Sequence, residues 1–110
     1  MKFEWDTKEN KQLLNAILAL ENTDEAKRFL RDLMTGGEIT EFSKRLEAAR
    51  MLSRDIQYNT IIEKTGLSST TIARISKWLR GSLGGYRLIL NRISSHHPSS
   101  QVRKGLISSI

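Results

Sequence analysis

Residues 58–79 read YNTIIEKTGLSSTTIARISKWL, and this stretch predicts two short helices joined by a tight turn. Gly66 breaks the chain between them, because glycine readily takes the positive φ that a tight helix end needs. Ser68 follows at the position of an N-cap, where its hydroxyl can accept a backbone N–H of the second helix. We therefore expect helices over residues 58–64 and 69–79, arranged as a helix-turn-helix.

The second of these helices has two distinct faces. Ile72, Ile75 and Leu79 recur at helical spacing and predict the face that packs inward. The other face is polar and basic, and the helix starts with small hydroxyl side chains that can approach phosphates and base edges closely. An arginine one turn later can make a two-pronged contact with guanine O6 and N7. The residues expected to read bases are Ser69, Thr70, Thr71, Arg74 and Lys77.

Charge is divided unevenly along the chain, whose net charge is +6. Residues 1–43 hold 6 Lys and Arg against 9 Asp and Glu, a net charge of −3, whereas residues 44–110 hold 12 against 3, a net charge of +9. Neutralisation of phosphates by Lys and Arg supplies most sequence-independent affinity for DNA. We therefore expect double-stranded DNA as a partner. The residues expected to contact its phosphates are Ser68, Arg54, Tyr58, Lys64, Arg80 and Arg87.

Two amphipathic helices are predicted before residue 35. Asp6 or Thr7 can cap the first, and Thr23 or Asp24 can cap the second, since each of these side chains has an oxygen that accepts a backbone N–H. Leucine, isoleucine and phenylalanine recur at helical spacing along both segments. Apolar stripes this wide on short helices need a partner, which is either the rest of the domain or a second subunit.

Two further helices flank the helix-turn-helix. Thr35 and Glu38 have the spacing of a capping box, so a helix is expected to start there and to run to about Arg54. A short final helix is expected over residues 86–94, after a glycine-containing break. Every predicted element is a helix, which predicts an all-α fold.

Length and composition limit the number of domains and the class of protein. A chain of 110 residues suits one domain, which we place at residues 1–94. Residues 95–110 are expected to form a flexible, serine-rich basic tail in which Arg103 and Lys104 can engage DNA phosphates. No apolar run approaches the ~20 residues of a membrane span, and the first residues are too polar and acidic for a signal peptide. The chain has no cysteine, which is consistent with a reducing cytosol but does not establish the compartment. A cytoplasmic location is expected.

Catalysis is not expected from this sequence. The chain has no cysteine nucleophile, and no histidine lies in the predicted folded region to activate one of its serines. His96 and His97 have no further ligands near them in sequence, so no metal site is expected. Gly81, Gly84 and Gly85 do not form a strand–loop–helix phosphate cradle, and no cofactor is predicted.

Several segments of the chain resemble the tryptophan-repressor superfamily, and within it the YerC/YecD branch. The run Thr71, Ile72 and Arg74 in the second helix of the helix-turn-helix is a marker of that superfamily. The resemblance implies a six-helix fold with a central helix-turn-helix, an intertwined homodimer and a role as a bacterial transcriptional regulator. The segments that carry it are LMTGGE (33–38), KRLEAARML (44–52), IIEKTGLSSTTIARIS (61–76) and GGYRLILNRI (84–93).

The resemblance also implies an effector site. Two arginines flank the bound amino acid in tryptophan repressors, and they match Arg45 and Arg74 here. The serine that contacts the ligand's amino group is replaced by Trp78, and the glycine after the second arginine is replaced by Ile75. Both replacements are bulky at a site that must hold a free indole. Our hypothesis is that the protein's own side chains fill this pocket, so tryptophan is not expected as co-repressor; the alternative for Trp78 is an ordinary packing aromatic.

Together these features predict a sequence-specific DNA-binding transcriptional regulator, with repression as the expected effect. It is expected to bind a two-fold symmetric operator as a homodimer through the recognition helix at residues 69–79. Two alternatives stay open. One is a protein-interaction module that uses the helical bundle without DNA, and the other is a monomeric DNA-binding module of a transposase-like or sigma-like type.

Overall fold

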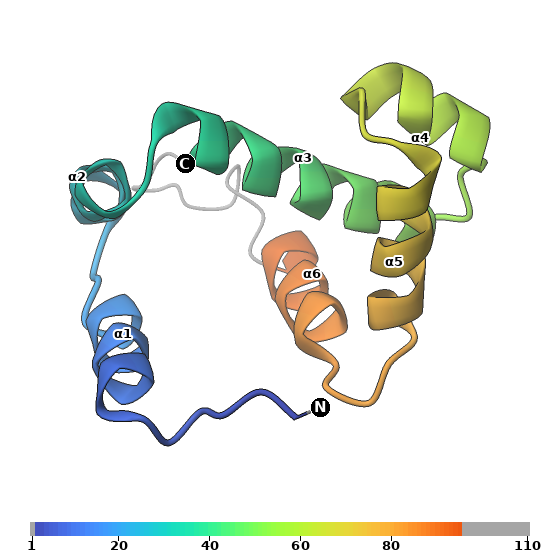
Figure 1. Ribbon diagram of the computed structural model, residues 1–110. Coiled ribbons are helices and arrows are strands. Elements are labelled where there is room, and N and C mark those ends of the chain that lie inside the picture. The colour runs from blue at the N-terminus through green and yellow to red at the C-terminus, as the bar shows by residue number, and fades with distance from the viewer. Residues whose placement is uncertain (1, 96–110) are drawn as a thin grey trace. The chain divides into compact units, whose positions relative to one another are not determined.

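The computed structural model describes residues 2–95, and this part of the chain contains helices and no strand. The predicted all-α, six-helix fold is therefore confirmed for these residues (Figure 1). Of the predicted tail, Ser95 is the last residue of a helix, and His96, His97, Arg103 and Lys104 lie outside the described residues. The helices are α1 (Lys8–Leu18), α2 (Thr23–Leu33), α3 (Gly36–Ser53), α4 (Tyr58–Thr65), α5 (Ser69–Leu79) and α6 (Gly85–Ser95).

These helices form two compact units. The first unit spans residues 1–35 and contains α1 and α2, and the second begins at Gly36 and contains α3 to α6. Within residues 2–95, no helix combines the length and the apolar character needed to cross a membrane.

The caps of the first unit were predicted in part. Thr7 caps α1, because its hydroxyl oxygen accepts the backbone N–H three residues on at 3.1 Å. The prediction for α2 was wrong: the cap is Asn22, whose side-chain oxygen accepts the N–H of Glu25 at 2.9 Å, whereas Thr23 and Asp24 already lie within the helix. The backbone of Asn22 is extended, which is the conformation of an N-cap residue.

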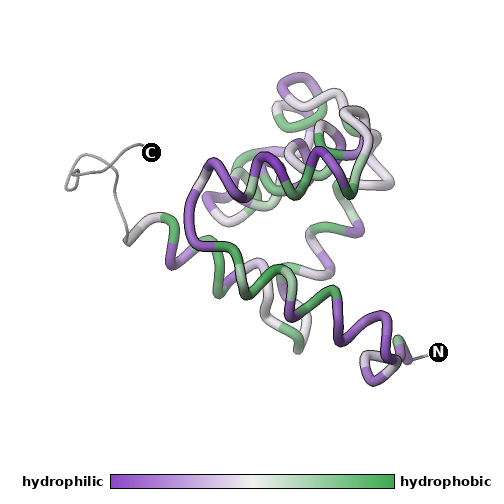
Figure 2. The backbone as a smooth tube through the Cα atoms, turned by 90° about the vertical axis from the view of Figure 1, so that its left-hand side faces the viewer, coloured by the Kyte–Doolittle hydropathy of each residue, from purple (hydrophilic) through white to green (hydrophobic). Residues whose placement is uncertain are grey.

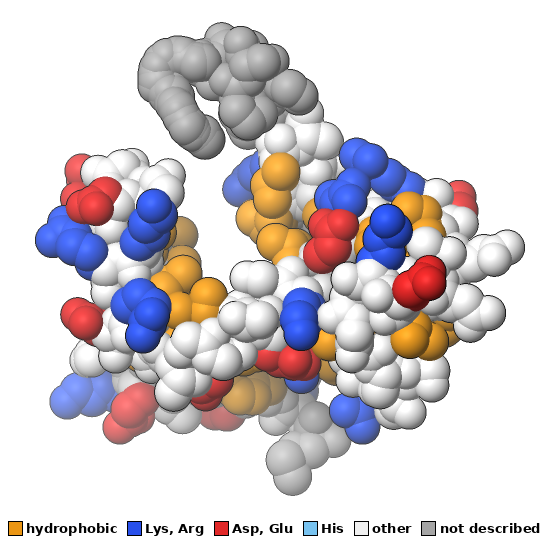
Figure 3. Space-filling model, turned by 90° about the horizontal axis from the view of Figure 1, so that it is seen from above, with side chains coloured by type: hydrophobic (Ala, Val, Ile, Leu, Met, Phe, Trp, Pro, Cys, Tyr) orange, Lys and Arg blue, Asp and Glu red, His pale blue; other side chains and the backbone are white. Residues whose placement is uncertain are grey.

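The apolar side chains of α1 and α2 find no cover within their own unit. Neither helix has a buried residue, and Leu18 is 82% exposed. Hydrophobic positions recur along the helical turns in Figure 2, and hydrophobic side chains, drawn in orange, reach the surface in Figure 3. The other large apolar residues that stand exposed on these helices are Leu13, Leu14, Ile17 and Leu33.

The second unit is built around the C-terminal half of α3, which packs against α4, α5 and α6 (Figure 1). Small side chains at Ala48 and Ala49 are fully buried and allow the other helices to approach α3 closely. Tyr86 and Leu90 of α6 pack against this core from the side. The buried apolar residues are Ala48, Ala49, Met51, Ile61, Leu67, Ile72 and Ile75.

The turn between α4 and α5 has the geometry that the sequence predicts. Gly66 has φ 75°, in the left-handed region, and its N–H donates to the carbonyl of Ile62 at 2.8 Å. The buried hydroxyl of Thr65 donates to the carbonyl of Ile61 at 2.7 Å and accepts the N–H of Leu67 at 3.2 Å. These bonds fix the direction in which α5 leaves α4.

Candidate nucleic-acid interface

The first turn of α5 is held by a side-chain cap and faces solvent. The Oγ of Ser68 accepts the backbone N–H of Thr71 at 3.1 Å, which confirms Ser68 as the N-cap. The same hydroxyl donates to the Oγ1 of Thr71 at 3.1 Å, so the Thr71 side chain is engaged and half-buried. Ser69 and Thr70 are exposed beside it. The start of α5 therefore presents small hydroxyl groups and the positive end of a helix dipole to any partner.

The rest of α5 separates a buried face from an exposed one. Ile72 and Ile75 are 0% exposed and anchor the helix in the core. Arg74 and Lys77 are exposed on the other side, one helical turn and two turns after Thr70. In the part of the chain that the structure describes, no hydrogen bond or ion pair engages the Arg74 side chain. The structure thus brings Ser69, Thr70, Arg74 and Lys77 to the exposed side of α5, whereas Thr71 is half-buried. The contact of these residues with bases stays a prediction.

Ala73 belongs to the same exposed face, and the sequence interpretation did not include it. It lies between Thr70 and Arg74 and is exposed. A methyl group at such a position can make an apolar contact with the methyl group of thymine. Its place three residues after Thr70 is the signal that could have identified it.

Apart from Ser68, the N-cap of α5, the residues expected to contact phosphates fall into two groups. Three of them are exposed near the two ends of α4: Tyr58 begins this helix, Lys64 lies in its last turn, and Arg54 precedes it after the end of α3. The N-cap residue of α4, Gln57, makes no side-chain hydrogen bond to the first N–H groups of this helix.

The other two arginines are tied back to α5. The Nη1 of Arg80 donates to the Oγ of Ser76, and the Nη1 of Arg87 donates to the carbonyl of Leu79. Both guanidinium groups keep further donors available. Acidic side chains are nearly absent from α4 to α6: residues 58–95 contain Glu63 alone, against Lys64, Arg74, Lys77, Arg80, Arg87 and Arg92.

The three residues of the predicted effector pocket have different surroundings in this structure, and their grouping into one pocket stays a prediction. Arg45 donates to the carboxylate of Glu41 at 3.2 Å and lies over the ring of Phe42, at 5.6 Å from the ring centroid. Arg74 stands on the exposed face of α5. Trp78 is 48% exposed and lines a cavity whose wall contains neither arginine.

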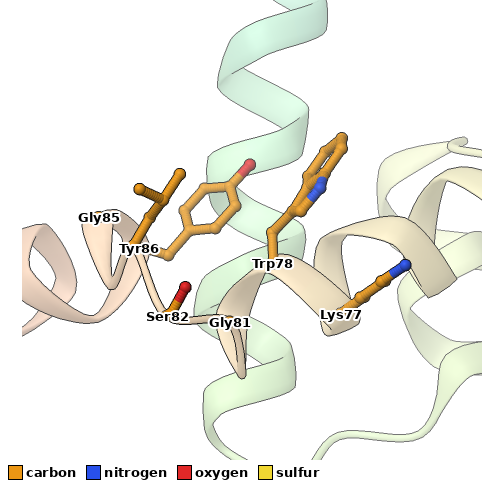
Figure 4. Close-up of a pocket in the computed structure, with 7 residues that line it drawn as sticks. Lys77, Trp78, Gly81, Ser82, Gly85 and Tyr86 are labelled. Atoms are coloured by element: carbon orange, nitrogen blue, oxygen red, sulfur yellow. The ribbon is translucent and has the colours of Figure 1, made fainter. Parts of the chain in front are cut away.

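That cavity has a volume of about 590 Å³ and lies where α5 turns toward α6. Figure 4 shows the rings of Trp78 and Tyr86 standing on the same side of this turn. Leu83 adds an apolar side chain to the wall. Burial raises the pKa of Tyr86, and the positive charge of Arg45 offsets part of that rise. Ile75, the other bulky replacement, is fully buried in the core.

Comparison with known sequences places this chain among repressor-like proteins. The sequence model of the family described as Trp repressor protein matches residues 8–94, which run from α1 into the last turn of α6. The uncharacterised protein YerC of Bacillus subtilis (strain 168) is 39% identical over 93 residues, covering 84% of this chain and 89% of YerC. The resemblance predicted from the sequence is confirmed.

Two solved structures share the fold. A TrpR-like protein from Eubacterium eligens ATCC 27750 superposes with a TM-score of 0.77 and is 39% identical, covering 82% of this chain and 93% of that one. A candidate Trp repressor from Staphylococcus aureus superposes with a TM-score of 0.72 and is 38% identical, covering 76% of this chain and 84% of that one. The predicted tryptophan-repressor-like fold is therefore confirmed.

Proposed function

Because this chain belongs to the Trp repressor protein family, a family of DNA-binding regulators, we propose that it is a sequence-specific transcriptional repressor. It acts in the cytoplasm as a homodimer on a two-fold symmetric operator. The observation that carries this proposal is the division of α5: Ile72 and Ile75 are fully buried, while Thr70, Arg74 and Lys77 are exposed opposite them. A helix anchored on one side and polar on the other can enter a major groove without losing its place in the core.

In the proposed complex, α5 enters the groove with its N-terminus leading. The hydroxyls of Ser69 and Thr70 approach base edges or phosphates, and the positive end of the helix dipole adds attraction for phosphate. Arg74 reads a guanine through its two-pronged guanidinium, and Lys77 lies one turn further along the same face. Tyr58 and Lys64 of α4 fix the register by contacting phosphates on the flank of the groove.

A homodimer explains the exposed apolar faces of the first unit. α1 and α2 bury none of their own residues, although their large apolar side chains recur at helical spacing. Phe42 and Leu46 in the N-terminal half of α3 are exposed as well. Removing apolar surface from water contributes about 25 cal/mol for each Å². We propose that a second copy covers these faces and that the pairing spaces the two copies of α5 along the DNA.

Tryptophan is not the co-repressor in this proposal. Ile75 occupies core volume, and the bulky indole of Trp78 stands where the resemblance implies a small serine in the ligand site. Isothermal calorimetry of the protein with free tryptophan is expected to show no saturable heat. Micromolar binding would contradict this part of the proposal and leave the DNA-binding part intact.

Selection of bound fragments from random duplex DNA tests the proposed function. The expected product is an inverted repeat whose half-sites lie roughly 10–10.5 bp apart, or a multiple of that spacing. Footprinting should then show protection on both half-sites. Recovery of no preferred sequence, or of a single unrepeated site, would contradict the proposed dimeric operator binding.

A further inference from the structure

A second cavity lies at the junction of three helices and contains three arginines. It has a volume of about 390 Å³, which falls in the range of roughly 300–1,000 Å³ for small-molecule sites. Arg50 lines it from the last turn of α3, Arg54 lines it from the residue that follows this helix, and Arg87 lines it from α6. Leu79, the last residue of α5, closes the third side. Residues from distant parts of the chain thus converge on one space.

Two of these arginines are held in place by bonds that leave donors unused. Arg50 donates from Nε and Nη2 to the two carboxylate oxygens of Glu47, at 2.8 and 2.6 Å, and keeps its Nη1. The bond to Arg50 also lowers the pKa of Glu47, which keeps that carboxylate charged and the pair intact. Arg87 donates from Nη1 to the carbonyl of Leu79 and keeps its other donors.

Gly84 contributes to the position of Arg87. Its φ of 71° lies in the left-handed region, and a Cβ added there would stand 3.0 Å from the Nη2 of Arg87. A side chain at this position would be strained by that φ, and its Cβ would crowd the end of the Arg87 side chain. The backbone therefore leaves room for Arg87 to fold back against the α5–α6 junction.

The cavity carries uncompensated positive charge. Among residues 2–95, no hydrogen bond or ion pair holds the side chain of Arg54. Three arginines against the single carboxylate of Glu47 leave a net charge of +2. Guanidinium groups are planar forks that match the oxygens of a phosphate, and such charge-assisted bonds are the strong ones.

Part of the lining is apolar. Leu79, Leu90 and Ile93 line the cavity together with the three arginines. A lining that combines guanidinium groups with apolar side chains fits a ligand that has both a phosphate and an organic group. An inorganic ion alone would leave these apolar side chains without a contact.

We propose that this cavity binds the phosphate group of a small phosphorylated molecule, with Arg50, Arg54 and Arg87 as its ligands. A phosphate of the DNA backbone is the other source of the same group. The site lies at the C-terminal end of α5, an 11-residue helix whose first turn is about 16 Å away. The inference stands apart from the proposed function, because the ligand can bind in the absence of DNA.

The first experiment titrates DNA-free protein with inorganic phosphate and with phenyl phosphate at constant ionic strength. Binding is followed by calorimetry and by the NMR signals of the arginine Nε–H groups. Saturable binding is expected, tighter for phenyl phosphate, with shifts confined to the three arginines of the cavity. Arg54→Gln should weaken binding about tenfold, since it removes a charge-assisted bond.

Arg92→Gln is the matched control, because it removes the same charge from α6 and Arg92 does not line the cavity. Equal losses in the Arg54 and Arg92 variants, or no saturable binding at all, would overturn the site. Thermal unfolding of both variants checks that each remains folded. Among the described residues, the side chain of Arg54 makes no hydrogen bond or ion pair that the substitution would remove.

The second experiment adds random-sequence duplex DNA to protein loaded with phenyl phosphate. Retention of the small molecule at saturating duplex supports a site for a free ligand. The opposite result is that the duplex displaces phenyl phosphate from the wild-type protein but not from the Arg54→Gln variant. That result overturns the assignment to a free molecule and identifies the DNA backbone as the source of the phosphate. Selection of operator sequences by the wild-type protein is a separate measurement. The proposed phosphate site and the proposed operator binding can therefore be contradicted independently of each other.

Discussion

At the scale of single residues, Arg74 offers the sharpest test of the proposed reading face. Its side chain is exposed and holds no hydrogen bond or ion pair within residues 2–95. Arg74→Ala is expected to reduce the preference for selected operator over random DNA by roughly 1–3 kcal/mol, because a two-pronged contact to guanine is lost. Equilibrium binding to both DNAs at one salt concentration measures this preference.

Arg92→Ala serves as the control for charge, since Arg92 is exposed on α6 away from the reading face. It should weaken binding to both DNAs by a similar factor, if at all, and leave their ratio unchanged. An unchanged ratio in the Arg74 variant would show that another residue reads the sequence.

Tyr86 gives a prediction about pH. Burial raises the pKa of its phenol above the ordinary value of 10.0, because the phenolate is disfavoured beside the core. The unfolded chain therefore loses this proton at a lower pH than the folded one. Above pH 10 the folded state binds more protons than the unfolded state, so the free energy of unfolding should fall as pH rises through that region.

The measurement uses Tyr58→Phe, which leaves Tyr86 as the only tyrosine. Ultraviolet titration of tyrosinate should give a midpoint above 10.0 in the folded protein, and urea unfolding should show the loss of stability over the same pH range. A midpoint at or below the ordinary value would contradict the burial of the ring.

At the scale of helices, the cap of α5 links stability to the reading face. Ser68→Ala removes the bond to the N–H of Thr71 and is expected to cost about 1 kcal/mol in the free energy of unfolding. Urea denaturation measures this cost. Ser69→Ala is the control, because Ser69 is exposed and lies within the helix rather than at its cap. Equal costs in the two variants would mean that the cap is not the stabilising contact.

Helix bounds could largely be predicted because their causes are local. Gly66 ends α4 and Ser68 caps α5 through their effects on neighbouring backbone groups, and both have the predicted roles. The cap of α2 was missed because three adjacent residues can all accept an N–H. The extended backbone of Asn22 decides among them, and the sequence pattern did not reveal that conformation.

The cavities could not be predicted because they depend on contacts between residues that are far apart in the sequence. Arg50 and Arg87 lie on different helices, and only the packing of α6 against α3 brings them to one wall. The grouping of Arg45 and Trp78 at one effector site came from the resemblance and stays a prediction. The structure ties Arg45 to Glu41 and leaves Trp78 beside a cavity that Arg45 does not line.

At the scale of the whole molecule, the proposed dimer can be broken from its first helix. Ile17→Glu places a charge on the exposed apolar face of α1, which we propose a second copy covers. Burying an unpaired carboxylate costs several kcal/mol, so the variant is expected to sediment as a monomer and to lose affinity for the two-fold operator. Analytical ultracentrifugation measures the first effect and gel-shift titration the second.

Gln12→Glu is the matched control, since it adds the same charge on the polar side of α1. It should sediment as the wild type does. Dimerisation of the Ile17 variant at wild-type concentrations would show that this face of α1 is not at the interface. The apolar stripes of the first two helices predicted that these helices need a partner. They did not predict how two chains are arranged, because that depends on surfaces that meet only in the assembly.

The uncovered leucines of α1 and α2 also bear on how such a regulator would respond to its own abundance. If a second chain covers the apolar faces of the first unit, as we propose, the amount of assembled regulator follows the square of the chain concentration while chains are mostly unpaired. Halving the supply of chains would then cut the assembled form to about a quarter. Operator occupancy would switch off more sharply than protein synthesis declines, so a modest change in gene dosage would have a large effect on transcription.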